Sequence, residues 1–174
     1  MPRSRTVLSS IALALALSVG VLASMALGAT TKSFTVSGSE LGATSTLGVF
    51  AGTATGELSG SWLAAVEHTP LDAEATITGG SFTFDTAIGG SPAFVTGTFT
   101  GGTVVLASED PGCGQQVYHV TGDLGSLSVV SGTGVASGGS GTFGPIVLTH
   151  HRTAFFGLCF TFRATVSGPV RLTY

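Results

Sequence analysis

The sequence predicts an all-β protein, built as a single antiparallel β-barrel or, as the alternative, a β-sandwich. Beyond residue 30, apolar and polar residues alternate with a period of two in segment after segment. Glycine-rich turn signals separate these segments about every 8–12 residues, as in sandwiches and barrels. No segment after the N-terminus has the period of an amphipathic helix. We therefore expect about eight to ten strands in one domain.

The first 29 residues have the features of a secretory signal peptide with its apolar helix. Arg3 and Arg5 precede an apolar run over residues 7–22, and small residues follow up to Ala29. Cleavage is expected after Ala26, with Ala29 as a second option. The alternative is an uncleaved anchor helix, because the run could nearly span a bilayer. The expected organisation is a signal peptide at 1–29 and a secreted all-β domain at 30–174, located extracellularly, in a periplasm or at a cell surface.

The remaining chain is acidic and poor in charge. Without Arg3 and Arg5, four basic residues stand against nine acidic ones, a net charge of −5. Four scattered cations cannot form a surface that follows phosphates, so we expect no nucleic-acid partner. Electrostatic attachment to an anionic membrane is unexpected for the same reason, and no membrane partner is predicted after signal removal. A single lysine and the absence of asparagine indicate a GC-rich bacterial coding bias.

The strand-like segments can be followed in order along the chain. They cover residues 31–36, 47–55, 57–68, 76–82, 98–104, 117–120, 124–130, 142–151, 154–166 and 170–174. In the third segment, Trp62 shares a face with Leu58 and Val66, so we expect it to be buried with them. The glycine- and serine-rich residues 131–141 are expected to form a flexible loop. In the last long segment, Phe160, Phe162, Ala164 and Val166 share one face, which predicts a strand with that face in the core.

Two segments resemble each other and favour the barrel. Residues 76–82 (TITGGSF) and 98–104 (TFTGGTV) each carry a glycine pair within an alternating run. Because the alternation continues through both pairs, we interpret them as bends inside strands, of the kind that curl a sheet into a barrel. Hairpin turns are the alternative. An immunoglobulin-like sandwich usually has its tryptophan between its two cysteines, whereas Trp62 precedes both here.

Cys113 and Cys159 are the only cysteines, and an even count in an exported chain predicts a disulfide. The alternatives, a free thiol pair or a metal site, would need a nearby cysteine or a histidine at ligand spacing. A zinc or copper site would need three ligands such as His68, His119 and one of His150 and His151, and the sequence does not suggest it. We expect no metal and no cofactor.

Motifs of common enzyme classes are missing from the chain. It has no Gly-x-Ser-x-Gly, His-Glu-x-x-His, P-loop or EF-hand sequence. The candidate ligand-binding residues are the polar side chains that interrupt apolar strands: His119, His150, His151, Arg152 and Arg163. Adjacent strand residues point to opposite faces, so one of His150 and His151 should face a concavity, with Arg152 or Arg163 nearby. A histidine there would make binding pH-dependent near neutrality.

The function expected from these features is a secreted β-domain that is not an enzyme. It would bind a small apolar or anionic ligand, or serve as a structural protein at the cell surface. The alternative is a cyclase- or isomerase-like enzyme built in a barrel, with His119, His151 and Arg163 lining its pocket. An open lumen would favour binding or catalysis over a structural role. Neither the ligand nor the oligomeric state follows from the sequence.

Overall fold

The computed structural model describes residues 29–132 and 134–174. The predicted signal peptide therefore lies outside the described residues, except for Ala29. Within the described part of the chain, no helix combines the length and apolar character needed to cross a membrane.

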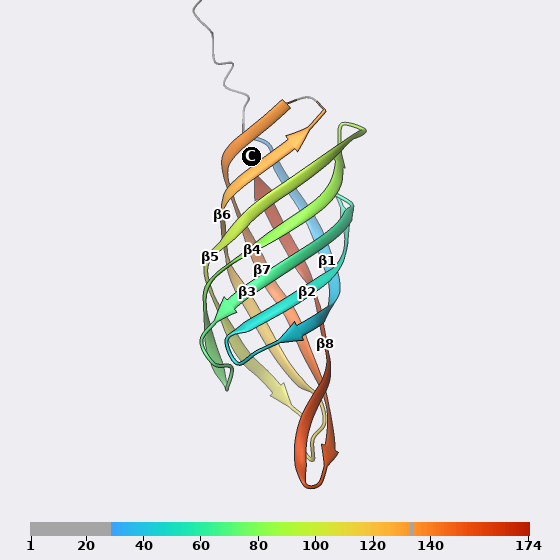
Figure 1. Ribbon diagram of the computed structural model, residues 1–174, viewed down its shortest axis with the longest axis vertical. Helices are drawn as coiled ribbons and strands as arrows, with labels where there is room; N and C mark the ends of the chain where they lie inside the picture. The colour runs from blue at the N-terminus through green and yellow to red at the C-terminus, as the bar shows by residue number, and fades with distance from the viewer. Residues whose placement is uncertain (1–28, 133) are drawn as a thin grey trace, which may run out of the picture.

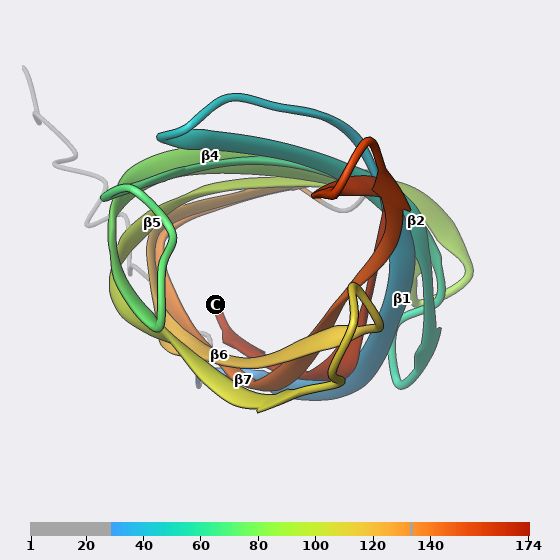
Figure 2. The ribbon, with the colours of Figure 1, turned by 90° about the horizontal axis from the view of Figure 1, so that it is seen from below.

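The described chain forms a closed barrel of eight antiparallel strands in sequence order (Figure 1, Figure 2). The strands are β1 (Thr31–Ala43), β2 (Leu47–Gly56), β3 (Gly60–His68), β4 (Glu74–Ile88), β5 (Ser91–Glu109), β6 (Gln116–Ser131), β7 (Gly134–Phe155) and β8 (Leu158–Thr173). Each strand pairs with its neighbours in sequence, and β1 pairs with β8 to close the ring. The predicted barrel is confirmed and the sandwich alternative is wrong. Closure leaves no unpaired sheet edge.

Alternate residues along each strand point into the barrel and out toward its surface. In β3, Ala64 is buried on the inner face while its neighbour Leu63 is exposed on the outer face. The core is the set of inward side chains from all eight strands, and it lies in the lumen. The inner face of a small barrel carries both small and large side chains. The small ones leave room for large side chains that point inward from neighbouring strands, and together they fill a barrel of this size.

The two glycine pairs lie inside strands, as predicted. Gly80 is within β4 and Gly102 within β5, and the β3–β4 register shifts beside the first pair. Gly80 has a φ of +122°, a conformation that side chains rarely adopt, and a Cβ there would meet the carbonyl of Ala65. The pairs therefore bend long strands around the barrel.

The prediction of a flexible loop at residues 131–141 is wrong. After the turn, Gly134 starts β7, which pairs with both β6 and β8. A Cβ at Gly139 would meet the backbone carbonyl of Thr173, so glycine permits close approach of β7 and β8 here. Composition suggested mobility, but glycine in a paired strand can instead serve close packing.

Strands β7 and β8 extend beyond the rim of the barrel as a hairpin (Figure 1). Pairing of β7 with β6 ends at His150, and pairing of β8 with β1 ends at Thr165. Further along, residues 151–155 and 158–163 pair only with each other.

The single strand predicted for residues 154–166 is wrong in its first part, because Phe156 and Gly157 form the turn of the hairpin and β8 begins at Leu158. The alternation at residues 160–166 does lie in a strand, and Ala164 is buried. Phe160 and Phe162, however, are exposed, because no neighbouring strand covers them.

Candidate functional site: a cavity in the barrel lumen

The barrel encloses a cavity of about 780 Å³ that opens at the end carrying the projecting hairpin. The turns between β1 and β2 and between β3 and β4 contribute to its rim. Its walls are side chains from all eight strands, and most of them are apolar. The large aromatic ones are Phe34, Phe50, Trp62, Phe82, Phe84, Phe99, Tyr118, Phe143 and Phe162.

The opposite end of the barrel is filled by side chains. Leu58, Val95 and Leu127 are almost completely buried there and do not line the cavity. Phe34 and Phe84, whose stacked rings lie 5.2 Å apart between centroids, line the cavity. The lumen is therefore open at the mouth and filled by apolar side chains at its other end.

Trp62 occupies the wall of the cavity. Glycines on the neighbouring inner positions make room for its indole ring, since a Cβ at Gly38 would lie 2.6 Å from the ring. The indole Nε1 donates a hydrogen bond to the carbonyl of Thr53 at 3.0 Å. Trp62 faces inward with Val66, as predicted, but both are half-buried rather than buried because they border open space.

Polar side chains gather at the mouth. Glu40, His68, Gln116, His150 and Arg163 all line the cavity there. Burial raises the pKa of the Glu40 carboxyl, and the nearby His68 opposes this shift. Burial lowers the pKa of His150, and the positive charges of Arg152 and His151 add to the effect. His150 is therefore neutral at neutral pH.

The structure divides the five predicted ligand-binding residues into three groups. His150 and Arg163 line the cavity. His151 and Arg152 lie outside it and contact the turn between β5 and β6. His119 is exposed on the outer face, where its neighbours across the sheet are Val105 and Val147.

Glu40, His68 and Gln116 also line the mouth but were not among the predicted binding residues. His68 had a usable signal, because it shares the inner face of its strand with Trp62 and Val66. For Glu40 and Gln116, alternation alone does not distinguish the inner face from the outer one.

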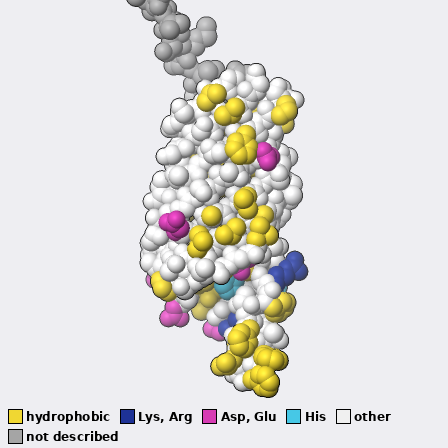
Figure 3. All heavy atoms as spheres, viewed as in Figure 1, with side chains coloured by type: hydrophobic (Ala, Val, Ile, Leu, Met, Phe, Trp, Pro, Cys, Tyr) yellow, Lys and Arg dark blue, Asp and Glu magenta, His cyan; other side chains and the backbone are white. Residues whose placement is uncertain are grey.

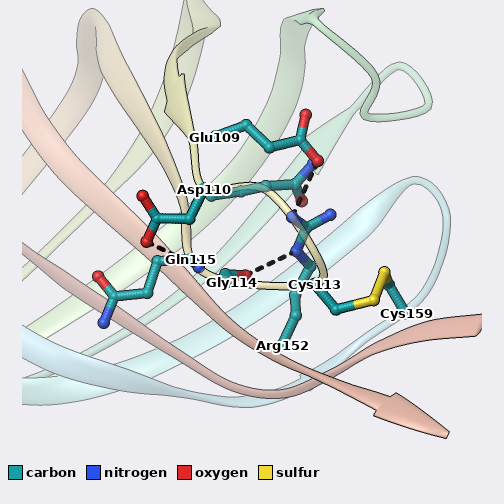
Figure 4. Close-up of polar contacts among 8 residues, drawn as sticks. Glu109, Asp110, Cys113, Gly114, Gln115, Arg152 and Cys159 are labelled. Carbon is teal, nitrogen blue, oxygen red and sulfur yellow. Dashed lines mark hydrogen bonds and ion pairs between the residues drawn. A yellow bond between two sulfur atoms is a disulfide. The ribbon is translucent and has the colours of Figure 1, made fainter.

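A group of contacts fastens the hairpin to the β5–β6 turn, and we call it the clasp (Figure 4). The predicted disulfide between Cys113 and Cys159 is confirmed, with 5.3 Å between the Cα atoms. The guanidinium of Arg152, whose side chain is only 10% exposed, pairs with Glu109 at 2.8 Å. Its Nε also donates a hydrogen bond to the carbonyl of Gly114 at 3.0 Å. The clasp holds one side of the mouth in a fixed shape.

Among residues 29–132 and 134–174, no group of three or more histidine, cysteine, aspartate or glutamate side chains is placed to hold a metal ion. Side chains of the types found at the mouth can form hydrogen bonds and ion pairs and can transfer protons.

Comparisons of the chain with protein-family models, with curated proteins and with solved structures find no match. The class of the protein is therefore defined by its architecture: an eight-stranded antiparallel barrel with an apolar lumen open at one end.

Proposed function

We propose that the barrel binds one small apolar or amphipathic ligand in its lumen. The observation that carries this proposal is the open apolar cavity. Its volume of about 780 Å³ falls within the range of about 300–1,000 Å³ that is usual for small-molecule sites. An eight-stranded barrel is just wide enough either to be filled by side chains or to hold one small ligand. Here only the closed end is filled.

The distribution of polar groups supports one orientation of the ligand. The apolar part would lie against the aromatic walls, where burial provides the binding free energy. A polar or anionic end would remain at the mouth, within the region lined by Arg163, His150 and Gln116. Burial raises the pKa of Glu40 at the mouth, so its carboxyl takes up a proton more readily than an exposed glutamate does.

We also propose that the domain works outside the cytoplasm. The disulfide is compatible with an oxidising extracellular or periplasmic location. The apolar leader in the sequence supports the same location.

An enzyme of the cyclase or isomerase kind is the second candidate. Glu40 and His150 both line the mouth and both have shifted pKa values, and such groups are often used for proton transfer. Of the residues first considered for this role, Arg163 lines the cavity and His119 and His151 do not. Turnover of a bound ligand, lost on His150→Gln with binding retained, would favour this candidate.

A cavity-filling substitution tests the binding proposal. Val66→Phe places an aromatic ring in the lumen, and Val105→Phe makes the same change on the exposed outer face. The dye 1-anilinonaphthalene-8-sulfonate and palmitate serve as ligands. Trp62, the only tryptophan of the chain, reports binding through its fluorescence.

We expect Val66→Phe to weaken binding by at least about tenfold, about 1.4 kcal/mol, and Val105→Phe to leave it unchanged. Thermal unfolding checks that both variants are folded. Equal binding by a folded Val66→Phe variant would show that the dye and palmitate do not occupy the lumen.

A further inference from the structure

The apolar residues of β8 change face where the strand leaves the barrel. The β7–β8 register shifts between His151 and Arg152, so Phe162 is an extra residue in β8, and Leu158 and Phe160 lie on the face opposite to that of Ala164 and the lumen wall. Along the sequence, every second residue of β8 is apolar or glycine. These residues are Leu172, Val170, Gly168, Val166, Ala164, Phe162, Phe160 and Leu158. Those within the barrel line or close the lumen, whereas Phe162, Phe160 and Leu158 are 68%, 48% and 63% exposed.

The rest of the hairpin adds two aromatic side chains to these exposed residues. Phe155 pairs with Leu158 across the hairpin, and Phe156 occupies the turn at 91% exposure. The ring of Phe155 lies 4.4 Å from that of Phe156 and 6.4 Å from that of Phe160, measured between centroids. Apolar side chains are gathered on this hairpin in Figure 3. We call Phe155, Phe156, Leu158, Phe160 and Phe162 the apolar tip.

The clasp keeps the apolar tip uncovered. Cys159 lies between Leu158 and Phe160, so its side chain points to the opposite face of β8, where it is bonded to Cys113. Arg152 adds its contacts to Glu109 and Gly114. The hairpin is thus held by one face while its apolar face stays free beside the mouth of the cavity.

We propose that the apolar tip inserts into the interfacial region of a lipid bilayer and places the mouth of the barrel against the lipid. With the mouth beside the lipid, an apolar ligand would pass between bilayer and lumen through the mouth. This passage rests on the proposed function, whereas the docking itself does not.

The size and place of the apolar tip favour a bilayer over a second copy of the chain. The five side chains are 48–91% exposed, so they present about 500–800 Å² in all if each offers about 150–250 Å² when fully exposed. This area is spread around a narrow two-stranded projection, and a single protein partner would cover only part of it. Each partner in a stable protein interface usually contributes about 800 Å². A bilayer surface needs only a few buried apolar side chains and adapts its shape to a projection.

The charge of the protein specifies the kind of bilayer. A net charge of −5 beyond the leader argues against electrostatic attachment, as noted from the sequence, but does not oppose insertion of apolar side chains. Binding should therefore occur on zwitterionic phosphatidylcholine, with no gain from added anionic lipid.

Vesicle flotation tests the docking. The barrel closes within residues 31–173, so a chain starting at residue 29 contains every strand and excludes the leader. Phe156→Ser/Leu158→Ser removes two exposed tip residues. Val130→Ser/Val135→Ser is the matched control, because these paired valines are 47% and 71% exposed at the opposite end of the barrel.

We expect the parent chain and the valine control to float with phosphatidylcholine vesicles, and the tip variant to bind at least about tenfold less. Equal flotation of the tip variant, or no flotation of the parent chain, would overturn the docking. So would a change from dimer to monomer in the tip variant by sedimentation, which would assign the apolar tip to self-association.

Binding of palmitate without vesicles separates the two proposals. If the parent chain binds palmitate but not vesicles, the docking is wrong and the ligand-binding function stands. If it binds vesicles but not palmitate, the docking stands and the lumen has another role. The tip variant should keep its palmitate affinity, because Phe156 and Leu158 do not line the cavity.

Discussion

Removal of the disulfide is the change whose effect on the free energy of unfolding follows most directly from the structure. Cys113 and Cys159 are 46 positions apart, and their bond restricts the unfolded chain by closing that loop. The chain-entropy relation gives about 4 kcal/mol for such a loop at 25 °C, as an upper value. For a domain of about 150 residues, each kcal/mol shifts the melting temperature by about 2–4 °C. Cys113→Ser/Cys159→Ser should therefore melt about 8–16 °C lower.

The loss should also have a local component. The disulfide holds the hairpin, and only Arg152 and its partners remain in the clasp without it. Thermal unfolding followed by circular dichroism measures the total effect. Hydrogen exchange should show faster opening of residues 151–155 and 158–163, while β2 and β3 keep their protection. A loss below about 1 kcal/mol, or two alkylatable thiols in the purified native protein, would refute the reasoning.

Two further predictions concern the mouth. Arg152→Ala should lower the free energy of unfolding by about 2 kcal/mol, since it removes charge-assisted hydrogen bonds to Glu109 and Gly114 from a nearly buried guanidinium. Chemical denaturation measures this, and Arg152→Lys should recover only part; an unchanged midpoint for the alanine variant would contradict it. The pKa of His150 is lowered in the folded protein, so as the pH falls below about 6.5 the unfolded chain binds a proton at this residue before the folded protein does. The free energy of unfolding therefore decreases as the pH falls through this range. His150→Gln should flatten the stability profile between about pH 7 and 5, and an unchanged slope would show that another group is responsible.

Local rules were sufficient for the barrel and for its disulfide. Alternation with a period of two, interrupted by glycine, predicts strands without knowledge of which side chains they contact across the lumen. The glycine pairs could be assigned to bends because the alternation continued through them. Pairing of the cysteines could be predicted from their even count and from the expected export of the chain.

The features that could not be predicted from the sequence depend on contacts between distant strands. Whether Phe160 is buried depends on where β1 and β6 stop beside the hairpin, and nothing in residues 158–166 encodes that. The open part of the lumen likewise arises from how side chains of all eight strands meet. The same dependence explains the strand at residues 134–141, where glycine composition suggested a loop and close packing against β8 decided otherwise.

The order of the strands has a consequence for how the molecule is assembled. Seven pairings join consecutive strands, but the eighth joins β1 to β8, and the hydroxyls of Thr31 and Thr173 meet across 142 positions of sequence. Hairpins can form one after another as the chain emerges, whereas closure waits for the final strand because its loop entropy is the largest. Until then β1 is an open edge that can pair with another chain. Since β8 also carries part of the lumen wall and one strand of the hairpin, the last step of folding completes the ring, the wall of the lumen and the projecting hairpin together.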